Sequence, residues 1–312
     1  MFKKLVKKLA IAATLVCMAT AVAATAAACN VETDHPEIMI TVEFNSVTYK
    51  LEYKLYRNMY PNTVRHFIEL TEKGVYNNVL IHDYRSSDWL SGGYEYNAED
   101  YTTAAESEAE GAFVDYLVNH SVEEKYMELF EAGALTPTVY SDSKFNDKGK
   151  QLLVKDSALP TLIGEFANNN HKIKKGELYA EMGTLKMYYY EKETTNKVHV
   201  TPTDDQIMWN YDYKNNCATS IFSMQVGSSS SISASKYCVF GKMESTKALA
   251  SLINAVSDYY ADNDAVSIDV DDVPVDNLVE IFSSESADRG TEQDFTLPAL
   301  PIIIKSVKVT KY

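Results

Sequence analysis

The segment Pro61–Gly93 constrains the fold of this 312-residue chain more than any other part of it. Pro61 suits the first turn of a helix, because its missing N–H would have no partner there. Apolar residues then recur at helical spacing, and Gly74 stands where a helix commonly ends in a left-handed residue. Residues 79–84 and 89–93 follow as two short strands, the second of which ends in two glycines. The segment therefore predicts a helix, a tight turn and a strand pair in one compact unit.

Alternating apolar and polar residues predict two further strands at the start of the folded region, over 38–44 and 48–56, joined by a turn at Asn45 and Ser46. Near the other end, residues 246–260 carry an apolar face at helical spacing and predict a second helix. Hydrophobic residues make up 46% of the chain, which is enough for a substantial core.

These sequence patterns resemble those of the cyclophilins, the peptidyl-prolyl cis-trans isomerases. The helix and strand pair resemble the family pattern P-x-T-V-x-x-F-x-x-L-x-x-x-G-x-Y, then F-H-R-V, then F-M-x-Q-G-G-D. Later segments are similar to other family motifs in the same order: PTLIGEF (160–166), GTLKM (183–187), TSIFSMQV (219–226), KYCVFGKM (236–243) and IIIKSVKV (302–309). The resemblance implies a mainly β fold, a cyclophilin-like closed antiparallel β-barrel with two flanking helices.

Two segments interrupt the resemblance, so the domain is expected to span 38–312 with two insertions. Residues of about 97–160 carry apolar stripes at helical spacing and are expected to be a helical insertion. Residues of about 262–296 are expected to be an acidic insertion. The first insertion is either a packed decoration on the barrel or an element that binds a partner.

The N-terminus predicts export. Four lysines precede an Ala-rich apolar run, which is typical of a secretory signal over residues 1–28. Cys29 follows three small residues, in a pattern that resembles a bacterial lipoprotein signal, and residues 29–37 would form a tether. Lipidation at Cys29 would anchor the protein to a membrane. Ordinary cleavage, giving a secreted protein, and an uncleaved anchor are the alternatives.

Charge and cysteine usage narrow the partners. The formal net charge is −15, so a phosphate backbone would be repelled and nucleic acid is not an expected partner. No metal or cofactor is expected, because the histidines lack the spacing of metal ligands. Cys217 and Cys238 could pair in an oxidising compartment. However, they begin two different strands, which would lie at opposite ends of an antiparallel hairpin, so the pairing stays open.

Most of the residues that the family resemblance implies for catalysis are replaced in this sequence. The resemblance implies an Arg donor near the prolyl nitrogen, which favours the twisted peptide bond. His82 matches the residue before that Arg, but Asp83 stands in its place, and an ionised carboxylate has no proton to donate. Arg85, two residues further along the strand, could project to the same side and restore a donor. It could instead be a surface partner of Asp83 or a solvated side chain at the end of the strand.

The residues that would bind a peptide are also changed. The resemblance places six of them around the groove: Trp89, Ser91, Tyr189, Ser220, Phe222 and Tyr237. Aromatic faces bind proline rings and extended peptides well. The same aromatic residues could instead reflect strand propensity and packing.

The leading interpretation is an exported, lipid-anchored protein of a bacterium that binds proline-containing or extended peptide segments, with weak or absent isomerase activity. One alternative is an active extracytoplasmic foldase whose rearranged site uses Arg85. Another is a non-enzymatic structural or adhesive module that works through its helical insertion.

Overall fold

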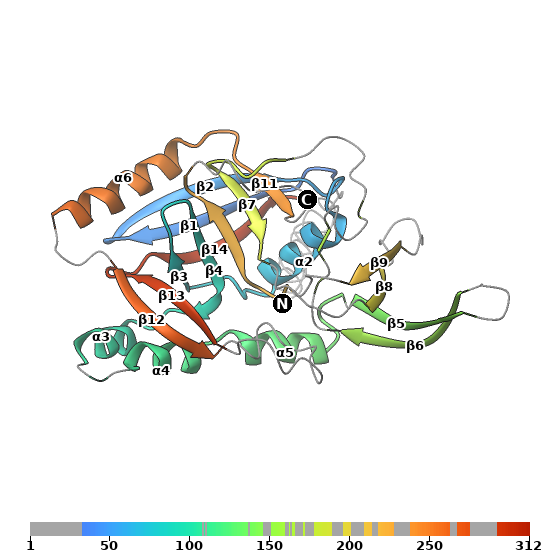
Figure 1. Ribbon diagram of the computed structural model, residues 1–312. Helices are drawn as coiled ribbons and strands as arrows, with labels where there is room; N and C mark the ends of the chain where they lie inside the picture. Colours follow the sequence, from blue (N-terminus) through green and yellow to red (C-terminus); the bar gives the residue numbers. More distant parts are fainter. Residues whose placement is uncertain are drawn as a thin grey trace, which may run out of the picture.

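The protein is described from a computed structural model, in which an eight-stranded barrel is the central element (Figure 1). The described residues are 33–107, 109, 111–136, 138–145, 151–159, 162, 164–165, 171, 178–188, 196–200, 209–213, 218–227, 238–262, 267–274 and 292–312.

The barrel is closed, and each of its neighbouring strand pairs is antiparallel, in the order β1-β14-β3-β4-β10-β7-β11-β2. Its strands are β1 (Glu37–Phe44), β2 (Val47–Leu55), β3 (Val79–Tyr84), β4 (Asp88–Glu95), β7 (Thr184–Met187), β10 (Phe222–Gln225), β11 (Val239–Lys242) and β14 (Ile303–Lys311). The first strand lies between β2 and the last strand, so pairing of the chain's two ends closes the barrel. The predicted fold class is therefore confirmed.

The first hairpin shows how the sequence specifies this arrangement. Along β1 every second side chain is buried, which is the pattern of a strand with one face toward a core. Asn45 and Ser46 connect it to β2 with positive φ angles of 47° and 62°. Two successive residues with positive φ give a tight turn whose twist matches that of the flanking strands. The predicted turn is thus present.

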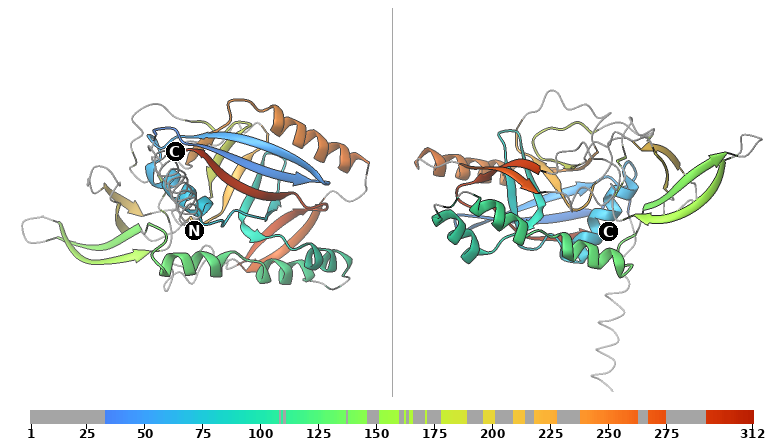
Figure 2. Two further views of the ribbon diagram at one scale, coloured as in Figure 1. Left: turned by 180° about the vertical axis from the view of Figure 1, so that it is seen from behind. Right: turned by 60° about the horizontal axis from the view of Figure 1, so that its bottom comes forward.

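Both predicted flanking helices are present, and Figures 1 and 2 show them on opposite sides of the barrel. Helix α2 (Pro61–Glu72) packs against β14, and α6 (Lys247–Ala261) packs against β2. Phe67 of α2 reaches an aromatic cluster inside the barrel, with ring centroids 4.7 Å from Tyr76, 5.2 Å from Phe222 and 5.1 Å from Phe240.

A buried carboxylate holds the start of α2. Glu165 is only 2% exposed, and its two oxygens accept hydrogen bonds from the Asn62 backbone N–H at 3.2 Å, the Asn62 side-chain amide at 3.0 Å and the Thr63 N–H at 2.8 Å. The first N–H groups of a helix have no partner within the helix and carry its positive dipole end. The preceding residue, Tyr60, supplies no side-chain cap. Glu165, from the segment similar to a family motif, therefore caps α2 from a distant part of the chain.

The insertion after β4 is only partly helical, which corrects the prediction for residues 97–160. Helices α3 (Ala98–Glu106), α4 (Ala112–Asn119) and α5 (Glu123–Glu131) come first. Then β5 (Thr138–Phe145) and β6 (Gln151–Leu159) form a hairpin, which β8 (Asn196–Val200) and β9 (Trp209–Tyr213) extend in the order β6-β5-β8-β9. Short apolar runs such as Leu152–Val154 fit a helix or a strand equally well, and only pairing between strands decides.

The described part of the second insertion is a β-ribbon. Strands β12 (Ser267–Pro274) and β13 (Glu292–Pro298) pair antiparallel, and we refer to them as the β12–β13 hairpin. Its strand β13 packs against β3, and its strand β12 packs against α4. The hairpin therefore lies between the barrel and the helical insertion (Figure 1).

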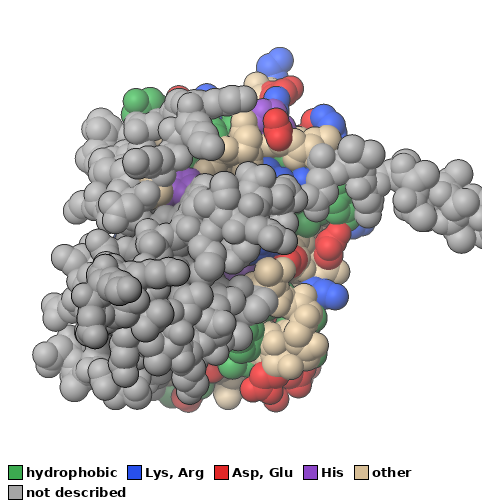
Figure 3. Space-filling view, turned by 90° about the vertical axis from the view of Figure 1, so that its right-hand side faces the viewer, with side chains coloured by type: hydrophobic (Ala, Val, Ile, Leu, Met, Phe, Trp, Pro, Cys, Tyr) green, Lys and Arg blue, Asp and Glu red, His purple; other side chains and the backbone are tan. Residues whose placement is uncertain are grey.

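Acidic and basic side chains lie interspersed on the described part of the face in Figure 3. Exposed ion pairs between such side chains, for example Lys311–Glu37 at 2.9 Å, contribute little to stability. Within the described residues, no helix has both the length and the apolar character needed to cross a bilayer.

The cap on α2 leads to a stability prediction. Replacing Glu165 by Gln removes the charge and leaves one acceptor for three donors. We therefore expect Glu165→Gln to lower the free energy of unfolding by about 2 kcal/mol, measured by urea denaturation. The control is Glu181→Gln, which removes an exposed carboxylate paired with Lys242 and should cost less than about 0.5 kcal/mol. Equal effects of the two substitutions would contradict the capping role.

Candidate functional site

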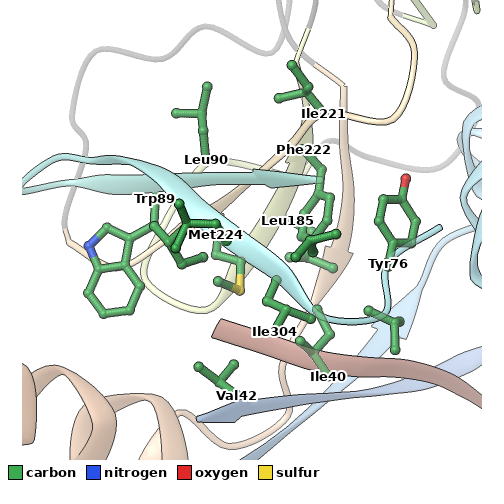
Figure 4. Close-up of a cluster of buried hydrophobic side chains, with 14 of the residues drawn as sticks. Ile40, Val42, Tyr76, Trp89, Leu90, Leu185, Ile221, Phe222, Met224 and Ile304 are labelled. Atoms are coloured by element: carbon green, nitrogen blue, oxygen red, sulfur yellow. The ribbon is translucent and has the colours of Figure 1, made fainter. Parts of the chain in front are cut away.

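The candidate site is built on the β3–β4 hairpin, and the direction of each side chain follows from strand pairing. On β4, Trp89 lies opposite Met224 and Ser91 lies opposite Phe222. Opposed residues of a pair share a face of the sheet. Figure 4 shows Trp89, Met224 and Phe222 on one side of this sheet, with Leu90 and Ile221 on the other. Trp89, Ser91 and Phe222 therefore face the barrel interior.

This orientation places three of the predicted substrate-binding residues in the interior of the barrel. Trp89 is 2% exposed, while Ser91 and Phe222 are fully buried. The Ser91 hydroxyl donates a hydrogen bond to the Leu80 carbonyl at 2.9 Å, and Phe222 belongs to the aromatic cluster around Phe67. In this structure the three side chains are part of the core, which is the arrangement that the packing interpretation of the aromatic residues describes.

Ser220 is also buried, and the position of its backbone explains why residue 92 is a glycine. Gly92 has a φ of +88°, and a Cβ added there would lie 2.5 Å from the Ser220 carbonyl oxygen. Only glycine tolerates both the conformation and the close approach. Ser220 and Gly92 thus maintain the contact between β4 and the start of β10. The remaining predicted site residues, Tyr189, Tyr237 and the lipidation candidate Cys29, lie outside the described residues.

The replaced catalytic position and its proposed substitute form one ion pair. Asp83 Oδ2 lies 2.6 Å from Arg85 Nη2, and their side chains are 1% and 56% exposed. Burial raises the pKa of Asp83, and the Arg85 guanidinium opposes that rise in part. The contact agrees with the prediction that Arg85 projects to the same side as Asp83, and specifically with its being a partner of Asp83.

A second polar group on this side of the sheet was not found from the sequence. Lys186 Nζ lies 3.0 Å from Asp88 Oδ2, and the Ser223 hydroxyl donates to the same oxygen at 3.1 Å. The lysine side chain is only 7% exposed. Lys186 lies between the buried residues Leu185 and Met187, so strict two-residue alternation could have predicted that it faces away from the core.

The β12–β13 hairpin covers the outer side of β3. The Phe295 ring stands edge-on to His82, with centroids 5.2 Å apart, and lies 5.9 Å from Tyr94. The Thr296 N–H donates a hydrogen bond to Asp83 Oδ1 at 3.3 Å. The register of β3 against β4 shifts between Ile81 and Asp83, which marks an irregularity at His82. Such a bulge re-aims neighbouring side chains and accounts for two consecutive residues meeting the same hairpin.

The chemistry available here is limited by these contacts. Asp83 forms an ion pair with Arg85 and accepts a hydrogen bond from the Thr296 backbone N–H, and an ionised carboxylate cannot donate one. Arg85 keeps donors that face solvent.

Among the described residues, no group of three His, Cys, Asp or Glu side chains is placed to hold a metal ion. Elsewhere, the Cys238 thiol is buried and donates to the Thr63 hydroxyl at 3.4 Å, whereas Cys217 lies outside the described residues.

Comparisons with known proteins bear on this site. Residues 39–284 match the model of the family described as cyclophilin type peptidyl-prolyl cis-trans isomerase/CLD. The comparison with curated proteins found no match.

Solved structures of low sequence identity are also similar. A cyclophilin type peptidyl-prolyl cis-trans isomerase of Cryptosporidium parvum is 14% identical with a TM-score of 0.37, and the match covers 89% of this chain and 99% of that one. The same isomerase in the presence of the dipeptide Ala-Pro is 12% identical with a TM-score of 0.36, covering 88% and 99%. The Mimivirus cyclophilin is 11% identical with a TM-score of 0.40, covering 91% and 93%.

Burial of His82 predicts a pH dependence of stability. Burial lowers the pKa of His82 from 6.5 to about 3, and the backbone at Leu80 opposes this only in part. Below pH 6.5 the unfolded chain therefore binds a proton that the folded protein cannot take up. The free energy of unfolding thus decreases as the pH is lowered. We expect the stability advantage of the wild type over His82→Phe to decrease by about 2 kcal/mol between pH 7 and pH 5. Urea denaturation at both pH values measures it.

The difference between the free energies of unfolding of the two proteins does not contain the contributions of other titrating groups. One such group is His66, because burial lowers its pKa as well. A difference that stays constant between pH 7 and pH 5 would show that His82 is solvated.

Proposed function

The chain belongs to the cyclophilin-type peptidyl-prolyl cis-trans isomerase family, and from this premise we propose that it is an exported protein which binds proline-containing or extended peptide segments, with weak or no isomerase activity. The observation that carries the proposal is the buried Asp83 carboxylate, which stands where the family resemblance implies a catalytic arginine.

The argument for weak catalysis starts from the reaction. Rotation about a peptide bond has a barrier of about 18–20 kcal/mol, and a donor near the prolyl nitrogen lowers it by favouring the twisted state. Asp83 offers no such donor when ionised. Its negative charge would also oppose the lone pair that develops on the nitrogen. Loss of one preorganised donor typically costs a factor of about 100–1,000 in rate.

Arg85 is a poor replacement for that donor. Its guanidinium is engaged by Asp83 at 2.6 Å, and the side chain is 56% exposed. A donor held by a carboxylate and surrounded by water stabilises a transition state less than one in a dry site. Displacement of a reacting group by only about 1 Å can cost a factor of about 100.

The proposed binding of extended segments uses the outer side of β3 and β4. Asp83, Arg85 and Asp88 supply both acceptors and donors there, and these match the alternating N–H and C=O groups of a peptide backbone. Such groups bind a peptide without acting on it, which is how this family scaffold would keep a binding role after losing its catalytic arginine.

Export and anchoring are proposed from the N-terminal sequence. A basic start, an apolar run and Cys29 after small residues would direct the chain across a membrane and supply an acyl anchor. Residues up to 37 would then act as a short tether between the anchor and β1, which begins at Glu37.

The activity prediction is tested with Ala-Xaa-Pro peptides by NMR exchange spectroscopy, which needs no coupling protease. We expect kcat/KM to lie at least about 100-fold below that of an active cyclophilin assayed beside it, because the donor is missing. An efficiency within 100-fold would sink the proposal of weak catalysis. If that activity were lost in Arg85→Ala but retained in Lys308→Ala, which removes an exposed cation from β14, the foldase that uses Arg85 would be the correct alternative.

The anchoring prediction is tested by expressing the full chain in a bacterium with a radiolabelled fatty acid. We expect the label and membrane association to be present in the wild type and absent in Cys29→Ser, since only the thiol accepts the lipid. The matched control, Cys217→Ser, should retain both. Labelling that persists in Cys29→Ser would refute the anchor.

A further inference from the structure

The β12–β13 hairpin is an amphipathic ribbon. Val270, Val273, Phe295 and Leu297 are buried, whereas four acidic side chains on the same two strands are exposed: Asp269, Asp271, Asp272 and Asp294. A two-stranded ribbon is marginally stable by itself in water. Its order therefore depends on what its apolar side packs against, which is β3 and α4.

Strand β13 lies on β3 in the manner of a bound peptide. Its Phe295 ring packs on His82 and Tyr94, and the next residue, Thr296, donates its backbone N–H to Asp83. An N–H that points at a side chain of another strand is not used for pairing within the hairpin. Backbone hydrogen bonds with a side-chain pocket at alternate positions are the general basis of extended-peptide recognition.

The end of β13 is held in the same way. Leu297 is fully buried, and the carbonyl of Pro298 accepts a hydrogen bond from the Tyr101 hydroxyl at 2.9 Å. Tyr101 belongs to α3, so the barrel and the helical insertion each hold part of the segment Phe295–Pro298. In four consecutive residues this segment presents an aromatic ring, a backbone N–H that donates to Asp83, a leucine and a proline.

We propose that the outer side of β3, with His82, Asp83 and Tyr94, is a peptide-binding surface which the chain's own β12–β13 hairpin occupies. Its external ligand is an extended segment of the same chemistry, in which an aromatic residue is followed by a free backbone N–H and then Leu-Pro. Asp83 has a role here that an arginine could not fill, because it accepts the N–H of the ligand backbone. This inference goes beyond the proposed function, since it assigns the occupant of the surface and does not require isomerisation.

Occupancy by the hairpin determines how tightly an external segment can bind. An attached ligand competes at an effective concentration of about 1 mM or more. The apparent affinity for an external peptide equals its intrinsic affinity multiplied by the fraction of molecules in which the surface is open. The wild type should therefore bind such a peptide weakly, and a change that loosens the hairpin should strengthen binding by the same factor by which it raises the open fraction.

The test uses the full chain and a synthetic peptide of residues 292–298, Glu-Gln-Asp-Phe-Thr-Leu-Pro, carrying a fluorescent label. Phe295→Ala removes the ring that holds the hairpin and leaves a space that the peptide phenylalanine fills. We expect Phe295→Ala to bind the peptide at least tenfold more tightly than the wild type does. A matched peptide with Ala in place of Phe should bind this variant at least tenfold more weakly.

A second variant keeps the test decisive if Phe295→Ala does not fold. Leu297→Val in the full chain removes one buried methylene group from the hairpin, whereas the added peptide keeps its leucine, so peptide binding should tighten about fourfold. The control is Val47→Ala, at a valine that is 51% exposed, which should bind as the wild type does. Affinities that are equal in the wild type and both folded variants, or equal for the two peptides, would overturn the proposal.

The outcome is separable from that of the proposed function. If the 292–298 peptide binds as expected while the chain isomerises Ala-Xaa-Pro peptides within 100-fold of an active cyclophilin, the hairpin proposal stands and the proposed weak catalysis fails. If Ala-Xaa-Pro peptides bind but neither variant gains affinity for the 292–298 peptide, the hairpin proposal alone is overturned.

Discussion

The two-residue period of strands in a closed barrel is the constraint on which the rest of this structure depends. Closure gives every strand an inside and an outside, so the phase of each strand decides which side chains make the core. On β4 this phase sends Trp89 and Ser91 inward, toward the cluster that Phe67, Tyr76 and Phe222 form. The polar contacts of Asp83 and Asp88 then lie on the other side of the sheet, away from the core.

A buried carboxylate connects this barrel to its helix. Glu165 receives three hydrogen bonds from the start of α2, and α2 carries Phe67 into the aromatic cluster. The cap is non-local, because it comes from about a hundred residues further along the chain. The cap fixes the position of the N-terminal end of α2, while the Phe67 ring fixes how closely the helix packs against the barrel core. The arrangement gives Glu165 a role in positioning α2, although this residue lies outside the strands of the barrel.

The residues His82 and Asp83 of β3 and the β12–β13 hairpin are chemically matched in this protein. Asp83 cannot supply the donor that isomerisation needs, but it accepts the Thr296 N–H, and His82 beside it packs on Phe295. An arginine at the same position would offer donors to an N–H group, which also donates. A carboxylate at this position therefore favours the contact with β13, which supports the proposal that this surface binds a peptide backbone.

The sequence by itself determined the barrel strands with clear alternation and both flanking helices, because the period of apolar residues is a local property. It could not determine the phase of β4 relative to its neighbours, so Trp89 and Phe222 were predicted in a groove although they fill the core. It also missed the strands β5 and β6, whose apolar runs suit either structure. The packing of Phe295 on His82 was decided only by the tertiary structure, since it joins segments more than two hundred residues apart, and only folding sets which surfaces meet.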